Sequence, residues 1–169
     1  GLEQPEDLTW KMPVQMGLLS EDLNRRFYQN DWSRSVAPAT SSLFQMECAK
    51  IGLPCRLNEQ RTPPAYETIH RQRRWQTCHL DGLVEIDGVL GIWEGKHTDA
   101  ISPWNREERV IEHNWWQFIH QMMTNDLPWV EVSVIHGNGN DRKVHRIHRD
   151  MDEETVLLAA EMEFLEALR

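Results

Sequence analysis

The sequence predicts an α/β domain in which a mixed β-sheet is flanked by helices on both faces. A hairpin turn of the Asp-Gly type, Asp87–Gly88, separates two runs of apolar and β-branched residues. Apolar residues recur at helical spacing on both sides of this hairpin, and a second pair of strand-like segments follows a long helical stretch. The expected order is therefore helix, helix, hairpin, helix, strand pair, helix.

One domain is expected from the length of 169 residues, and no internal repeat is present. Residues 1–15 should form a loose lead-in with an acidic start, and residues 16–169 should form the domain.

Two helices are expected before the hairpin. Residues 17–27 form the first, because apolar residues lie four positions apart there. Residues 40–42 offer N-caps for the second, which should end near Gly52. The basic stretch that follows, as far as Trp75, fits either a loop or an irregular strand.

A long helix should follow the hairpin over residues 107–125. Alternating valines mark a strand that ends near His136, and a Gly-Asn turn leads into its partner strand, residues 143–148. Asp150 or Asp152 can cap the final helix, which carries an apolar stripe.

The hairpin places charged residues opposite one another. Its two-residue turn fixes the register, so that Asp81 should face Glu94 and Lys96 should face His79. Side chains alternate along a strand, and these four should therefore share one face. Directly opposed like charges repel each other, so folding alone would not favour the carboxylate pair.

A divalent cation would resolve this repulsion. Carboxylate oxygens are hard ligands that suit Mg²⁺ or Mn²⁺, and a neighbouring lysine can stabilise phosphoryl charge or a water-derived nucleophile. The pattern therefore predicts metal-assisted phosphodiester hydrolysis. The alternative is a surface hairpin whose acids and lysine form exposed pairs, each worth about 0–1 kcal/mol. Spacing alone leaves both interpretations open.

Three stretches carry a family resemblance. His79–Val84 followed by Glu94–Lys96 resembles the Asp…(Asp/Glu)-x-Lys core of the restriction-endonuclease-like nucleases, and specifically their YqaJ or phage lambda exonuclease-like branch. Met16–Glu21 is similar to the Gly-x-x-x-Glu helix start of that branch, and Gln117–Met122 is similar to its glutamine helix. The matching elements cover the chain from about residue 16 to 165.

The resemblance implies a restriction-endonuclease-like core and a DNA nuclease that depends on Mg²⁺ or Mn²⁺. The implied metal ligands are oxygen groups: the carboxylates of Glu21, Asp81 and Glu94 and the main-chain carbonyl of Gly95. Lys96 would orient the attacking water. Gln117 would help to position that water or the scissile strand.

The substrate stays open between two kinds of nuclease. The resemblance implies an exonuclease acting on double-stranded DNA ends in phage-type recombination, with a ring-like homo-oligomer and a single-strand annealing protein as partners. Members of that branch usually begin with a further helix that carries an arginine and a serine near the DNA end, and nothing before Gly17 matches it. A structure-selective or nonspecific endonuclease is the alternative.

A third alternative is a nucleic-acid-binding or assembly protein that no longer cuts. Intact Asp81, Glu94 and Lys96 favour an enzyme, since a chain without catalysis has no reason to keep a repulsive carboxylate pair.

The formal net charge of −9 has the wrong sign for binding nucleic acid. Basic residues nevertheless gather before the hairpin: Arg56, Arg61, Arg71, Arg73 and Arg74. We expect Arg71, Arg73 and Arg74 to contact DNA, and the alternative is a solvated loop.

Other cofactors are less well supported. The three cysteines have no C-x-x-C spacing, which argues against a disulfide framework, a zinc ribbon or an iron–sulfur cluster. A zinc or manganese site built from His79, Asp81 and His97 is the remaining alternative, but His97 should point to the opposite face from Asp81. No apolar run is long enough to cross a bilayer, so a cytoplasmic protein is expected, in the host cytoplasm if it is phage-encoded.

Overall fold

The structure, a computed structural model, describes residues 12–98, 107–137 and 142–168. Within these ranges the chain forms, in order, α1 (Met12–Trp32), β1 (Val36–Pro38), α2 (Ser42–Lys50), β2 (Cys55–Asn58), β3 (Ala65–Ile69), β4 (Thr77–His79), β5 (Gly82–Ile86), β6 (Val89–Thr98), α3 (Glu107–His113), α4 (Trp115–Asn125), β7 (Trp129–His136), β8 (Arg142–His148) and α5 (Met151–Ala167).

Two sheets organise the molecule. The larger has the strand order β1-β5-β6-β7-β8, with β6 and β7 parallel and the other neighbours antiparallel. The smaller is antiparallel, in the order β2-β3-β4. The predicted mixed sheet with a hairpin and a later strand pair is therefore confirmed. β2 and β3 of the smaller sheet lie in the basic stretch that fitted either a loop or an irregular strand, whereas β4 includes His79 from the start of the expected hairpin.

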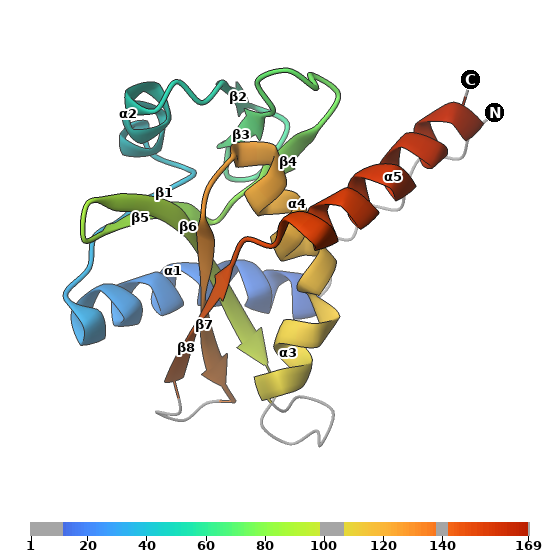
Figure 1. The fold of residues 1–169 in the computed structure, drawn as a ribbon. Helices are drawn as coiled ribbons and strands as arrows, with labels where there is room; N and C mark the ends of the chain where they lie inside the picture. The colour runs from blue at the N-terminus through green and yellow to red at the C-terminus, as the bar shows by residue number, and fades with distance from the viewer. Residues whose placement is uncertain (1–11, 99–106, 138–141, 169) are drawn as a thin grey trace.

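Helices cover both faces of the larger sheet, as predicted (Figure 1). Successive residues of β6 point to opposite faces, because side chains alternate along a strand. Ile92 belongs to the core that includes Phe118 and Ile119 of α4. Trp93 belongs to a second, smaller core with Tyr28 of α1, and their ring centroids lie 5.9 Å apart.

The hairpin register is the one that the turn predicts. Asp87 and Gly88 both have positive φ, which a two-residue turn of type I′ requires. The ladder runs from the pair of Ile86 and Val89 to the pair of Gly82 and Trp93, where β5 begins. The strand pairing is thus confirmed for the part of the hairpin next to the turn.

The expected pair of His79 and Lys96 is wrong. His79 belongs to β4 and faces Glu67 of β3 in the smaller sheet, while Lys96 faces Val134 of β7. The chain leaves the larger sheet before Gly82, so the segment preceding β5 pairs elsewhere. This exchange of partners is a tertiary effect that the turn does not control.

The helices differ from the predictions mainly at their ends. α1 begins at Met12, inside the expected lead-in, and residues 1–11 lie outside the described residues. The side chain of Ser41 caps α2 by accepting from the N–H of Phe44, and the side chain of Asp150 caps α5. The expected helix over residues 107–125 is divided into α3 and α4 at Asn114.

Candidate active site

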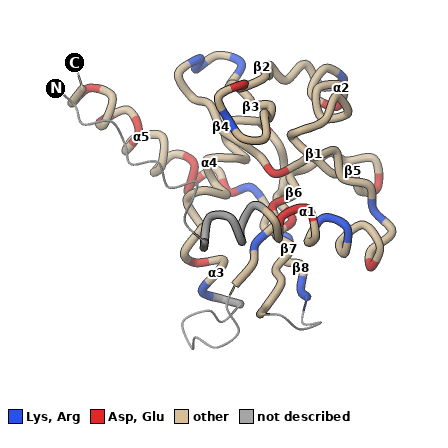
Figure 2. The backbone as a smooth tube through the Cα atoms, turned by 180° about the vertical axis from the view of Figure 1, so that it is seen from behind, with Lys and Arg blue, Asp and Glu red and all other residues tan. Residues whose placement is uncertain are grey.

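The candidate site lies in a notch at one edge of β6. β5 stops pairing at Gly82, opposite Trp93, whereas β6 continues to Thr98 with β7 as its partner. Residues 94–96 therefore have a strand neighbour on the β7 side alone among the described residues. Side chains from α1, α4 and the segment before β5 can reach this edge. Figure 2 shows acidic positions gathered where α1 crosses β6.

Glu94 is the buried centre of a hydrogen-bond network, with 3% of its surface exposed. Its Oε1 accepts from Nζ of Lys96 at 2.9 Å and from Nε2 of Gln117 at 2.7 Å. Its Oε2 accepts from Nε2 of Gln121 at 3.0 Å. The structure thus brings together three of the predicted residues, Glu94, Lys96 and Gln117, and adds Gln121.

Asp81 reaches the same place from the turn before β5. Its Oδ2 accepts from the backbone N–H of Gly95 at 2.9 Å, so it lies beside the Glu-Gly-Lys segment without being a ladder partner of Glu94. Burial raises the pKa of the Asp81 carboxyl well above its usual range, and the charges of Glu94 and Glu21 raise it further. The predicted closeness of the two acids is therefore present, though by a different backbone route.

Glu21 approaches from α1. Burial and the negative charge of Glu94 raise the pKa of Glu21, while Arg61 and Arg25 partly offset that rise. Glu21, Asp81 and Glu94 are thus close enough for their charges to act on one another. Repulsion among three carboxylates held this close together destabilises the native fold at neutral pH.

This donor set fits a hard divalent cation, because it consists of carboxylate oxygens with excess negative charge. In the part of the chain that the structure describes, no three His, Cys, Asp or Glu side chains stand close enough together to hold a metal ion as they are. Both oxygens of Glu94 instead accept hydrogen bonds from Lys96, Gln117 and Gln121. Metal binding would require Glu94 to exchange some of these donors for the cation.

Asn24 fixes α1 against the site. Its Nδ2 donates to the carbonyl oxygens of Lys96, at 3.1 Å, and Ser133, at 2.7 Å. Its Oδ1 accepts from the hydroxyl of Ser133 at 2.6 Å. Because Glu21 lies one helical turn before Asn24, these bonds set where the Glu21 carboxylate stands.

Sequence reasoning missed Asn24 and Gln121. Gln121 lies four residues after Gln117, so helical spacing places both on the same face of α4. This signal could have identified it. Asn24 depends on backbone carbonyls of β6 and β7, and no local pattern points to such partners.

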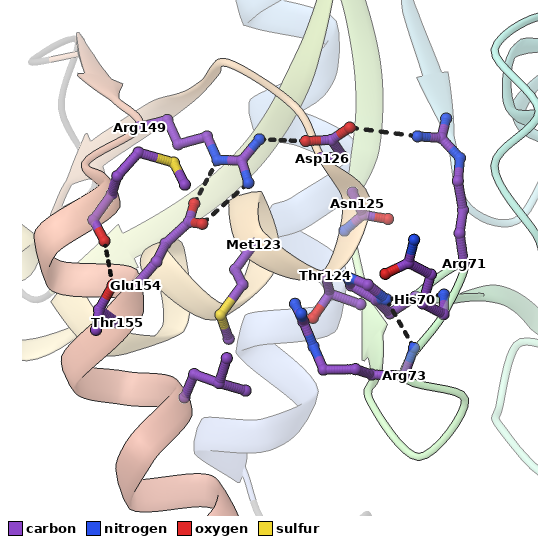
Figure 3. Close-up of a pocket in the computed structure, with 13 residues that line it drawn as sticks. His70, Arg71, Arg73, Met123, Thr124, Asn125, Asp126, Arg149, Glu154 and Thr155 are labelled. Atoms are coloured by element: carbon purple, nitrogen blue, oxygen red, sulfur yellow. Dashed lines mark hydrogen bonds and ion pairs between the residues drawn. The ribbon is translucent and has the colours of Figure 1, made fainter.

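Arg71, Arg73 and Arg74 lie away from this notch. All three guanidinium nitrogens of Arg71 are engaged, with the carbonyls of Ile51 and Gly52 and with the carboxylate of Asp126. Arg71 and Arg73 line a pocket of about 340 Å³ between the loop before β4, the end of α4 and the start of α5 (Figure 3). Arg74 is exposed.

A different pocket opens beside Asp81. It has a volume of about 280 Å³, and its lining includes Glu21, Asp81 and two other arginines, Arg25 and Arg61. The arginines that line a pocket with the carboxylates, Arg25 and Arg61, are therefore not the ones that the sequence suggested as nucleic-acid contacts.

The alternative histidine site is not assembled. His79 pairs with Glu67 at 3.2 Å, and Nε2 of His97 lies 3.0 Å from the carbonyl oxygen of Gly137. The three cysteines are free thiols. None of the described helices combines the length and the apolar character that a membrane span requires.

Comparison with solved structures defines the class of fold. An alkaline exonuclease from Laribacter hongkongensis matches with a TM-score of 0.52 and 19% identity, over 91% of this chain and 72% of that one. The protein SSO0001 matches with a TM-score of 0.51 and 10% identity, over 92% of this chain and 62% of that one. This chain thus spans less than two thirds of the length of SSO0001.

These likenesses confirm the expected fold, a mixed sheet between helices. No protein-family model matches the sequence, and the comparison with curated proteins finds no match.

Proposed function

We propose that this protein is a DNA nuclease that depends on Mg²⁺ or Mn²⁺ and hydrolyses phosphodiester bonds. The observation that carries the proposal is the convergence of four side chains on the edge of β6 that has no strand partner in the described part of the chain, within a nuclease-like fold. These side chains are Glu21, Asp81, Glu94 and Lys96. Three acids and a lysine gathered in this way cost stability in the free protein. Metal-assisted phosphoryl transfer requires such a cluster, because the acids bind the cation and the lysine stabilises developing negative charge.

Different side chains of the site would bind the cation and orient the attacking water. Glu21, Asp81 and Glu94, with the carbonyl of Gly95, would hold the cation. When bound, that cation would neutralise charge on the scissile phosphate and acidify a water molecule. Lys96 would orient the attacking water and stabilise its developing negative charge.

Gln117 would act beside Lys96. Its Oε1 lies 3.3 Å from Nζ of Lys96 while its Nε2 donates to Glu94. Once a cation occupies Glu94, the amide group of Gln117 can turn to the attacking water or to the substrate strand. Gln121, which is buried, would keep Glu94 oriented.

We infer that double-stranded DNA ends are the substrate. The matching alkaline exonuclease supports an exonuclease over an endonuclease. By the same resemblance, a ring-like homo-oligomer and a single-strand annealing protein are the proposed partners, in the cytoplasm of the host cell if the protein is phage-encoded.

The test is incubation of the purified protein with linear and covalently closed circular DNA of the same sequence. With Mg²⁺ or Mn²⁺, the linear form should be degraded much faster than the circle, and chelator should abolish degradation. Rapid nicking or linearisation of circles would assign the protein to the endonucleases. Absence of any cleavage with either metal would contradict the proposed activity.

A further inference from the structure

The pocket beside Asp81 has walls from four parts of the chain. The lining residues come from α1, the segment around the end of β1, the loop between β2 and β3, and the turn before β5. Arg25, Thr40 and Arg61 contribute polar side chains to the lining. Since Glu21 and Asp81 also line it, the pocket opens directly onto the proposed catalytic centre.

The guanidinium group of Arg61 is available to bind a ligand in this pocket. Among the described residues its side chain has no hydrogen-bond or ion-pair partner, and it is exposed. Its positive charge nevertheless lowers the pKa of both Glu21 and His79, so it lies near both residues. Arg25 is less free, because it is paired with Asp22.

The balance of charge in the pocket depends on the cation. Three acids and two arginines line it: Glu21, Asp22, Asp81, Arg25 and Arg61. Without a cation this set would repel an anion. A divalent ion on Glu21 and Asp81 would leave the arginines dominant, so an anionic group should enter only together with the metal.

We propose that this pocket, the Arg61 pocket, binds a backbone phosphate of the substrate strand next to the scissile phosphate, with Arg61 as its main contact. This inference rests on the proposed nuclease function. A guanidinium group suits the role because its planar array of donors matches phosphate oxygens in charge and geometry.

The size of the pocket agrees with a single nucleotide unit. Its volume of about 280 Å³ lies near the lower end of the roughly 300–1,000 Å³ of small-ligand sites. Arg25 would add a second charge from α1, and the hydroxyl of Thr40 would add a donor from the segment after β1.

The experiment compares Arg61→Gln, Arg61→Lys and Thr40→Glu with a control, Arg26→Gln. Arg26 neighbours Arg25 and pairs with the same Asp22, but it does not line the pocket. Binding of a fluorescent linear duplex is measured by anisotropy in Ca²⁺ over a range of salt concentrations. Cleavage is measured in Mg²⁺, and melting temperatures are recorded for every variant.

Arg61→Gln should weaken binding roughly tenfold, as expected for the loss of one charge-assisted contact, and should reduce the salt slope by about one. Its KM should rise while kcat changes little. Arg61→Lys should recover part of the affinity. Thr40→Glu should weaken binding through added negative charge, and Arg26→Gln should behave like the unmodified protein.

In one outcome, the unmodified protein binds and cuts DNA while Arg61→Gln and Thr40→Glu both keep its affinity and salt slope. That result would overturn phosphate binding by the Arg61 pocket and leave the proposed function intact. If Arg61→Gln folds poorly, the Thr40→Glu result decides. Failure of the unmodified protein to bind or cut DNA would overturn the proposed function, and this inference with it.

Discussion

At the scale of single residues, the three acids of the notch differ in how well the fold satisfies them. Glu94 is buried but accepts hydrogen bonds from Lys96, Gln117 and Gln121. Asp81 is half-buried, and the hydrogen bond that it accepts comes from the N–H of Gly95. A partly desolvated charge with few donors beside two other carboxylates is costly, so Asp81 should destabilise the metal-free protein.

Replacing Asp81 by asparagine should therefore stabilise the metal-free protein. Asparagine keeps an oxygen for the N–H of Gly95 and removes the repulsion from Glu94 and Glu21. A gain of about 1 kcal/mol would raise the melting temperature by roughly 2–4 °C in a domain of this size. Melting curves in chelator provide the measurement.

The stabilisation should also depend on pH. Because the pKa of Asp81 is raised in the folded state, the fold binds this proton more tightly than the unfolded chain does. Stability is thus lost as pH rises from the usual aspartate range through the raised pKa. The advantage of Asp81→Asn should be absent below a pH of about 3.9 and should grow as the pH rises through the raised pKa.

Saturating Mg²⁺ should shrink or reverse this advantage, since a ligand of the native state stabilises the unmodified site selectively. If Asp81→Asn is the less stable protein both in chelator and in Mg²⁺, Asp81 has a structural role and the metal-centred interpretation of the notch is wrong.

At the scale of secondary-structure elements, α1 depends on its contact with β6 and β7. Asn24 is the polar side chain at that contact, and it is 1% exposed. Its replacement by alanine would remove three hydrogen bonds and leave buried carbonyl and hydroxyl groups without a partner. Such groups cost about 1–3 kcal/mol each when unsatisfied.

Asn24→Ala should therefore lower the melting temperature by several degrees and should also reduce cleavage, because Glu21 loses its fixed position. Asn30→Ala is the matched control, since Asn30 lies on the exposed side of the same helix. Thermal unfolding and cleavage rates of both variants are compared. Equal effects of the two substitutions would show that Asn24 does not anchor α1.

Local signals explain which elements could be predicted. The Asp-Gly turn fixed the hairpin register, and the caps at Ser41 and Asp150 marked the starts of α2 and α5. The smaller sheet was not predicted, because β2, β3 and β4 are short and depend on one another. The same non-local pairing drew His79 away from Lys96.

The candidate site shows the same division. Glu94 and Lys96 follow from strand alternation and Gln117 from the family resemblance, and the structure joins the three by hydrogen bonds. Arg61 could not be distinguished from Arg71 by sequence, because both lie in one basic stretch. Their different surroundings, a pocket at the carboxylates for one and Asp126 for the other, arise from the folding of the loops around β3.

At the scale of the whole molecule, the net charge of −9 opposes DNA binding at long range. The acids of the notch contribute to this charge, and a bound cation would offset them locally. Affinity for DNA should therefore depend on a divalent cation far more than it would in a basic protein.

Ca²⁺ should support DNA binding without efficient cleavage, because it occupies oxygen sites with longer and looser coordination than Mg²⁺. Binding should weaken steeply with salt, by a slope of roughly −0.9 for each phosphate contacted. Anisotropy titrations in Ca²⁺ and in chelator measure both effects. Equal affinity in Ca²⁺ and in chelator would show that DNA binding does not depend on a cation at the carboxylate site.

The most direct test of the central claim is the rate of DNA cleavage in Mg²⁺ by Asp81→Ala, Glu94→Ala and Lys96→Ala, beside the unmodified protein and Arg26→Gln. Phosphoryl transfer relies on positioning and charge stabilisation, so the loss of any one of the three groups should reduce the rate by roughly two or more orders of magnitude. Arg26→Gln should cut at the unmodified rate. Full activity in any of the three alanine variants would contradict the assignment of this notch as the catalytic centre.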